Sequence, residues 1–320
     1  MVNKFEYPYI RPNQSWVVKL LKPIIAILLF YCIYITLNGY KNELVWPSLS
    51  KNKIHYVFFV LILMPLNWFI ESRRWQMVMQ YIGKPVSLKK SIESTIAGLT
   101  LSMITPFKLG DYAGRMLLLR SEYKKSSLYA TLLCSIYQNV VNLSFGIIAM
   151  YFLIQLNNHF EEHMWPFVIL NTVVVVMALF VMLKVDVIIG HIGSIPWVNE
   201  KLSLGRIDEL GIASKFHLML LSILRYSIYI TQYVLILYFL NVENSILELI
   251  GGISAIFLIQ STIPLPPFLS FLARTEIAIL VWKIIGLHLS VALAATVMLW
   301  VINLMLPALL GLVLILYKWR

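Results

Sequence analysis

Thr105-Pro106-Phe107-Lys108-Leu109-Gly110-Asp111 interrupts an apolar run that extends from residue 88 to residue 119. A second apolar run, from residue 246 to residue 285, is interrupted in the same way by Pro264-Leu265-Pro266-Pro267. Proline removes a backbone donor and clashes with the preceding helical turn, so it ends or kinks a helix. Each run therefore predicts two half-helices, with the breaks placed at Pro106 and Gly110 in the first run and at Pro264 and Pro267 in the second.

The amino-acid composition distinguishes a membrane protein from a soluble one. Of the 320 residues 60% are hydrophobic and only 13% are charged, against about 25% charged residues in ordinary soluble domains. The mean hydropathy is +0.80. A soluble globular protein is excluded, and we expect one integral membrane domain over residues 1–320. The net charge of +11 is spread in short pieces between apolar runs, which is typical of cytoplasmic loops rather than of a nucleic-acid interface.

Unbroken apolar runs long enough to cross a bilayer, which takes roughly 20 residues, occur at about 23–40, 54–71, 128–156, 165–183, 216–240 and 288–317. The predicted fold is an all-α integral membrane protein with about six transmembrane helices and two proline-broken re-entrant hairpins.

The charges beside each broken run predict the face from which it enters. The first run is flanked by basic residues, namely Arg73, Arg74, Lys84, Lys89 and Lys90 before it and Arg120, Lys124 and Lys125 after it. The second is entered through Glu243 and Glu248 without Lys or Arg, and is left near Lys283 and His288. Because basic loops stay in the cytoplasm, we expect one hairpin from each face of the cytoplasmic membrane, with both termini in the cytoplasm.

The two halves of the chain resemble each other. A shift of 161 residues places Pro106 on Pro267, Arg115 on Glu276, and Asn142 on Asn303. The repeats cover about 54–156 and 216–317, and the single crossing at 165–183 between them makes the second repeat enter from the opposite side. This predicts an inverted repeat, with a substrate site at the repeat interface near the midplane.

Ionisable residues at membrane depth are the candidate substrate-binding groups: Lys108, Asp111, Arg115, Arg225, Arg274 and Glu276. Each central Arg, Lys or Asp costs roughly 2.5 to 3.5 kcal/mol on insertion scales, so these charges should face each other or water. The four-residue spacing of Asp111 and Arg115 places them on one helical face. Two interpretations stay open, structural ion pairs at the hairpin tips or a polar pathway for a substrate.

The sign of these charges favours an anion. Four of the six are cationic, and half-helices that begin after the prolines would add exposed N–H groups. A lipid phosphate is the obvious anion in a membrane, and Arg can bind it with two parallel hydrogen bonds. The plainer alternative is that the prolines only break helices. On the transporter interpretation, Arg115 and Glu276 attract each other across the repeat axis until a lipid phosphate competes for Arg115.

These motifs resemble the transmembrane region of lysylphosphatidylglycerol synthases over about residues 54–317. The residues that carry the resemblance are Arg74-Trp75, Pro106, Gly110-Asp111, Arg115, Pro264, Pro267 and Glu276. The resemblance implies a flippase of charged or isoprenoid-linked lipids. The family usually has glycines before the second-hairpin acid, whereas this chain has Phe268-Leu269-Ser270-Phe271-Leu272-Ala273. The synthase domain of the longer members is absent from these residues, so any lipid synthesis is expected elsewhere.

Three functions compete. The first is a transporter of an anionic or polyprenyl-phosphate-linked lipid; with no G-x-x-x-x-G-K-[ST] motif, ATP hydrolysis in this chain is not expected. The second is a membrane enzyme of lipid or glycan assembly in the cell envelope, and the third is an accessory subunit that anchors a synthase or glycosyltransferase. We expect no enzyme activity, cofactor or metal. Residues 159–163 do match the zinc-protease pattern H-x-x-E-H, but they lie in what is predicted to be an outer loop. The expected partners are membrane lipids, with a possible synthase or glycosyltransferase, and no nucleic acid.

Overall fold

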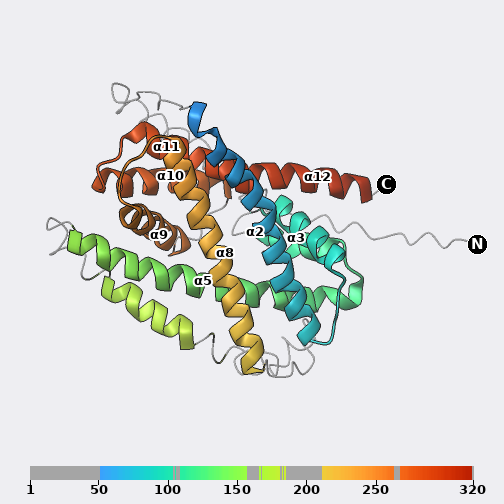
Figure 1. Ribbon diagram of the computed structural model, residues 1–320. Helices are drawn as coiled ribbons and strands as arrows, with labels where there is room; N and C mark the ends of the chain where they lie inside the picture. The colour runs from blue at the N-terminus through green and yellow to red at the C-terminus, as the bar shows by residue number, and fades with distance from the viewer. Residues whose placement is uncertain are drawn as a thin grey trace, which may run out of the picture. The chain divides into compact units, whose positions relative to one another are not determined.

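The computed structural model describes residues 51–103, Thr105, 109–156, Pro166, 168–180, Met182, Lys184, 211–262 and 267–318. By its internal contacts the chain divides into residues 1–42 and 43–320, and all described residues belong to the second unit. Within these residues the fold is helical throughout (Figure 1). The elements are η1 (Lys51–Lys53), α2 (Ile54–Tyr81), α3 (Leu88–Ser102), α4 (Leu109–Leu117), α5 (Ser121–Leu156), α8 (Ile212–Phe239), α9 (Ile246–Thr262), α10 (Pro267–Ile284), α11 (Leu289–Trp300), the π-helical segment η4 (Val301–Met305) and α12 (Leu306–Lys318).

In the part of the chain that the structure describes, four helices are long and apolar enough to span a bilayer: Ile54–Tyr81, Ser121–Leu153, Ile212–Phe239 and Leu289–Tyr317. They correspond to four of the six predicted crossings and confirm an all-α membrane protein. The predicted linking crossing at 165–183 is described in part, as the shorter apolar helix Val168–Phe180. The predicted crossing at 23–40 lies outside the described residues, so the total number of crossings stays a prediction.

The predicted end of the second crossing is wrong. It was placed at Glu71, before a run of charges, but α2 continues to Tyr81. The helix continues because its charges have partners: Arg73 is exposed and donates to Gln76 at 2.7 Å, while Arg74 is fully buried in ion pairs and hydrogen bonds. Arg74 is therefore not one of the loop charges that flank the first hairpin. Helix α5 likewise begins at Ser121 rather than at 128.

Both proline-broken runs form helix pairs, as predicted. In the first, α3 packs closely against α4; in the second, α9 packs against α10. Thr105 closes the first turn between helices, because its hydroxyl donates to the carbonyl of Leu101 at 3.0 Å and accepts from the N–H of Gly110 at 2.6 Å. Pro106, Lys108 and Pro264 lie outside the described residues, and Pro267 begins α10. The membrane face from which each pair enters stays a prediction.

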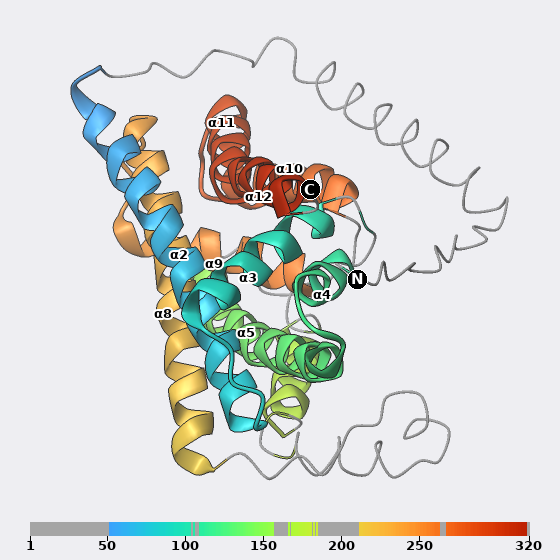
Figure 2. The same ribbon diagram turned by 90° about the vertical axis from the view of Figure 1, so that its right-hand side faces the viewer.

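The same order of elements occurs twice, with α2, α3, α4 and α5 in the first half and α8, α9, α10 and α11–α12 in the second. The two halves exchange partners. Helix α5 packs on α9 of the second hairpin, and α12 packs on α3 of the first. Figures 1 and 2 show α2 and α8, the first helix of each half, side by side, as their contacts require. The opposite orientation of the two repeats in the membrane stays a prediction.

Glycine allows both of these reciprocal contacts. A Cβ atom at Gly146 of α5 would collide with Leu258 of α9, and a Cβ atom at Gly311 of α12 would collide with Thr100 and Ile96 of α3. Without a side chain, each spanning helix approaches the hairpin of the other half at backbone distance. At the second contact, Thr100 also donates to the carbonyl of Ala308 at 3.2 Å.

Candidate functional site

Glu71, on α2, lies at the centre of a buried ion cluster. Its Oε1 atom is 2.6 Å from Nη2 of Arg115 on α4. Its Oε2 atom is 3.2 Å from Nη1 of Arg225 on α8 and 3.6 Å from Nη2 of Arg74 on α2 itself. One carboxylate thus holds three arginines that come from three helices, and joins the first hairpin to the first helix of each repeat.

Arg115 is the most completely neutralised of these cations. Besides Glu71, it donates from Nε to Oδ1 of Asp111 at 2.9 Å and from Nη2 to Oδ2 at 3.3 Å. The predicted pairing of Asp111 with Arg115 is confirmed. The expectation that Arg115 attracts Glu276 is wrong for this conformation, because Glu71 and Asp111 are its acidic partners.

Arg74 is held by polar atoms of α5. Its Nη1 donates to Oε1 of Gln138 at 2.5 Å, and its Nη2 donates to the carbonyl oxygen of Cys134 at 2.5 Å. Together with Glu71, these acceptors compensate a charge that would otherwise be costly to bury.

Arg225 lies midway along α8 and is more accessible. Its Nε donates to Oδ1 of Asn67 at 3.0 Å, and Nη1 is 3.4 Å from Oε1 of Gln138. Its guanidinium also lies over the ring of Tyr229, 5.5 Å from the ring centroid. The side chain keeps 17% of its surface exposed, compared with 3% for Arg115.

The cluster of Glu71, Asp111, Arg74, Arg115 and Arg225 carries one surplus positive charge, because three guanidinium groups face two carboxylates. Asp111 and Arg225 are its accessible members, with 20% and 17% of their side-chain surface exposed. An incoming group would therefore meet the cluster at these two side chains. The net charge favours an anion there.

A row of polar side chains leads from this cluster to the second hairpin. Gln138 donates from Nε2 to Oδ1 of Asn142 at 3.2 Å, one turn further along α5. Asn142 in turn donates from Nδ2 to Oγ of Ser261 at 3.2 Å, in the last turn of α9. We call these three side chains the polar row. All three are partly buried.

The second hairpin contributes Arg274 and Glu276 on α10. The Nε atom of Arg274 is buried and has no hydrogen-bond partner among the described residues. Glu276 is partly buried and engaged in an interaction of its own. The structure thus brings Asp111, Arg115 and Arg225 together around Glu71, and no hydrogen bond or ion pair among the described residues joins Arg274 to them.

Sequence reasoning missed Glu71, Asn67 and Gln138 as members of the site. The signal for Glu71 was present: it precedes Arg74 by three residues, which places both side chains on one face of a helix. A charged pair at the end of an apolar run is also typical of the end of a crossing, and α2 shows that this second interpretation is wrong here. Gln138 and Asn142, one turn apart in an apolar run, give a similar signal.

Within the described residues, no three His, Cys, Asp or Glu side chains are grouped as a metal site. The H-x-x-E-H stretch at 159–163 lies outside those residues.

Comparison with known proteins gives one match. A family model described as "Lysylphosphatidylglycerol synthase TM region" matches residues 19–311. Neither the curated proteins nor the solved structures include a match to this chain.

Proposed function

The chain belongs to the lysylphosphatidylglycerol synthase TM region family, and on this premise we propose that it is a transporter of an anionic lipid. The family and the apolar helices make it a multi-pass membrane protein of lipid-related processes. The proposal goes further: the cargo is a phospholipid or a polyprenyl-phosphate-linked lipid, the chain moves it between the leaflets of the cytoplasmic membrane, and no chemical bond is made or broken.

The surplus positive charge of the ion cluster is the observation that carries this proposal. Three arginines meet two carboxylates inside helices that are apolar enough to cross a bilayer. Ionisable groups at membrane depth are costly and mark substrate pathways in transporters. A lipid phosphate at the accessible edge of the cluster would balance the charge.

The geometry separates two roles among the cations. Arg115 already binds two carboxylates and is buried, so it fixes the first hairpin to α2. Arg225 and Arg274 remain for the phosphate, because Arg225 is partly exposed and Arg274, unlike Arg74 and Arg115, has no carboxylate partner within the described part of the chain. This division differs from the expectation from the sequence, in which a lipid phosphate competes with Glu276 for Arg115.

Both repeats line the same site, since the ion cluster and the polar row draw side chains from α2, α4, α5, α8 and α9. If the two repeats can adopt two arrangements, an anion that binds between them stabilises the arrangement for which it has the higher affinity. The size of the shift is set by the difference between the two affinities. Lipid movement would then be downhill or coupled to an ion gradient.

Leaflet exchange in proteoliposomes tests the proposal. The full chain is reconstituted with fluorescent phosphatidylglycerol, and the fraction of lipid accessible to a membrane-impermeant quencher is followed with time. We expect wild-type protein to accelerate exchange, Arg225→Gln to slow it at least roughly tenfold because a charged hydrogen bond is lost, and Arg225→Lys to retain part of it.

Arg73→Gln is the matched control, because Arg73 lies on α2 next to Arg74 but is exposed and bonded to Gln76. It should leave exchange unchanged. If wild-type protein exchanges lipid no faster than empty liposomes, the transporter proposal fails, and an enzyme or an anchoring subunit of lipid or glycan assembly takes its place.

A further inference from the structure

The hydrogen bonds of the polar row can run in one direction only. A guanidinium group has donors and no acceptor. Gln138 therefore turns Oε1 toward Nη1 of Arg74, at 2.5 Å, and Nη1 of Arg225, at 3.4 Å. Its amide nitrogen must then point the other way, toward Asn142. The orientation of this side chain follows from its two cationic neighbours.

The same reasoning fixes Asn142. Because Gln138 presents N–H to it, Asn142 must accept with Oδ1, at 3.2 Å. Its own Nδ2 then faces Oγ of Ser261, also at 3.2 Å. Each amide accepts a hydrogen bond from the preceding group and donates one to the next residue. Hydrogen bonds that are aligned in this way polarise and strengthen one another.

Ser261 is the end of the row, and its hydroxyl hydrogen is left to donate. Other hydroxyls of the spanning helices donate to a carbonyl one turn earlier, as Thr131 does at 2.7 Å, Ser222 at 2.7 Å and Thr296 at 2.8 Å. For Ser261, Asn142 is the one hydrogen-bond partner that the described residues provide. The row therefore presents a polarised O–H donor at the end of α9, directly before the break of the second hairpin.

Arg225 is connected to the helix that carries this donor through Tyr229 and Phe257. The ring of Tyr229 contacts Phe257, one turn before Ser261 on α9, with ring centroids 6.3 Å apart. The hydroxyl of Tyr229 is 3.5 Å from Nη2 of Arg225. An acceptor that carries negative charge is favoured beside an O–H donor whose row of hydrogen bonds begins at two guanidinium groups.

We propose that the Ser261 hydroxyl is a specificity-determining donor to a phosphate oxygen of the bound lipid, and that Gln138 and Asn142 are positioning residues that aim it. The inference rests on the proposed function and names a subsite within it. The hydrogen bond is charge-assisted, and such bonds are shorter and roughly twice as strong as neutral ones. The subsite reads the phosphodiester, which many lipids share, and not the group esterified to it.

Lipid binding to the full purified chain tests the subsite. Phosphatidylglycerol is titrated into the protein in detergent, and bound lipid is quantified by native mass spectrometry. Ser261→Ala should weaken binding roughly tenfold, the loss of one hydrogen bond to a charged group, and Ser261→Thr should restore it. Ser227→Ala is the matched control, since Ser227 is exposed on α8 and donates to its own helix at Ile223. Equal binding by wild type and Ser261→Ala overturns the inference.

A double-mutant cycle tests the positioning role. Asn142→Leu alone should weaken binding about as much as Ser261→Ala, and the two substitutions together should weaken it no further. Additive losses would show that Asn142 acts independently of Ser261 and overturn its positioning role. If Asn142→Leu does not fold, the comparison of Ser261→Ala with Ser261→Thr still decides the subsite.

Two further arms separate the outcomes. In the first arm, inorganic phosphate is added as competitor at millimolar concentration. If Ser261→Ala abolishes the binding of inorganic phosphate but leaves the binding of phosphatidylglycerol unchanged, the subsite binds the free anion. That result overturns the lipid assignment. Leaflet exchange is measured on the same samples. If Ser261→Ala binds lipid more weakly but the wild-type protein does not accelerate leaflet exchange, the subsite is kept and the transporter proposal is refuted. If the wild-type protein accelerates exchange but Ser261→Ala binds lipid as well as wild type does, the subsite alone is refuted.

Discussion

Arg115 of the first hairpin and Glu71 of α2 form a buried ion pair, with 2.6 Å between Nη2 and Oε1. The two residues are far apart in sequence, and the pair fixes the hairpin against a spanning helix. Because Glu71 also reaches Arg225 of the second repeat at 3.2 Å, this carboxylate holds both halves of the site together.

Glu71→Gln should destabilise the protein. The substitution leaves three arginines facing the single carboxylate of Asp111, and breaking a buried ion pair costs about 3 to 5 kcal/mol. Thermal unfolding in detergent, followed by tryptophan fluorescence, should show a clearly lower midpoint. Glu122→Gln, at an exposed acid in the first turn of α5, is the control; equal midpoints for the two variants would contradict the central position of Glu71.

Asp111 and Arg115 should act as a unit. Each single substitution by alanine leaves a charged partner without its bond, so the double variant should be less destabilised than the sum of the two, with a coupling energy of about 0.5 to 3 kcal/mol. Midpoints of denaturant or thermal unfolding for all four proteins provide the measurement. Strict additivity would mean that the 2.9 Å bond between Nε and Oδ1 contributes nothing.

Gly146 and Gly311 should tolerate no large side chain. Leucine at either position would force apart α5 from α9, or α12 from α3, and overpacking of this kind costs about 1 to 3 kcal/mol. Both variants should unfold at lower temperature than wild type. Gly211→Leu is the control, because a Cβ atom there meets nothing within 4 Å. Unchanged stability of Gly146→Leu and Gly311→Leu would argue against the reciprocal packing of the repeats.

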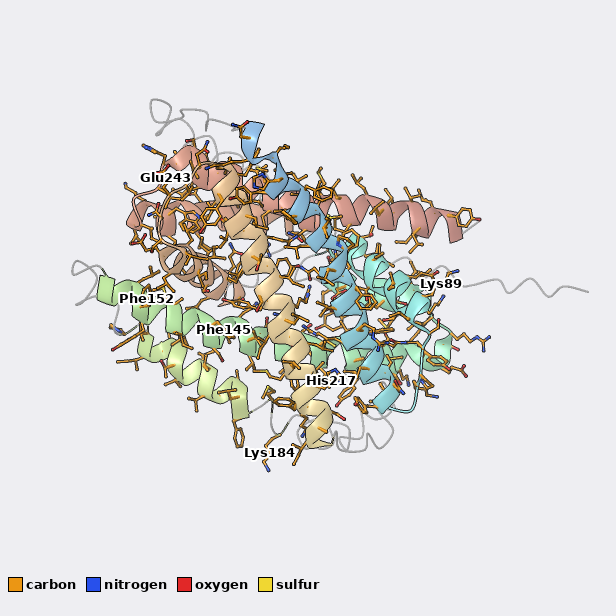
Figure 3. All side chains as sticks on the ribbon, in the orientation of Figure 1. Lys89, Phe145, Phe152, Lys184, His217 and Glu243 are labelled. Carbon is orange, nitrogen blue, oxygen red and sulfur yellow. The ribbon has the colours of Figure 1, made fainter. Side chains whose placement is uncertain are left out.

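Cysteine labelling should find both ends of the first hairpin on one side of the membrane. Lys84→Cys and Glu122→Cys should react with an impermeant reagent from the cytoplasm, and Glu243→Cys from outside. Figure 3 shows Glu243 and His217 at opposite ends of α8, as this topology needs. Native Cys134 is buried and should stay unlabelled. Reaction of positions 84 and 122 from opposite faces would refute the re-entrant hairpin.

The sequence predicts the fold of this chain better than its site. Proline breaks and apolar runs are local signals, so the two helix pairs and four spanning helices could be read directly from residues such as Pro267 and from run lengths. The internal shift also places Asn142 on Asn303, and the structure repeats its elements in the same order.

The partners inside the site could not be predicted, because they depend on which helices touch. Spacing alone pairs Asp111 with Arg115, four residues away. Glu71 is the second partner of Arg115 because α3 packs on both α2 and α4 and so brings their side chains within reach of each other. Arg74 was misplaced for a related reason, since flanking-charge rules assume that a basic residue near the end of an apolar run faces water, whereas here Gln138 and Cys134 of α5 accept its hydrogen bonds.

The most direct test of the central claim, that the surplus positive charge beside Glu71 binds a lipid phosphate, is the selectivity of lipid binding. Phosphatidylglycerol and a neutral diacylglycerol with the same acyl chains compete for the purified protein, and the ratio of bound lipids is measured by mass spectrometry. We expect wild-type protein to prefer phosphatidylglycerol, Arg225→Gln to reduce the preference roughly tenfold by removing the surplus charge, and Asp111→Asn to preserve or increase it. An identical ratio for wild type and Arg225→Gln would contradict the account.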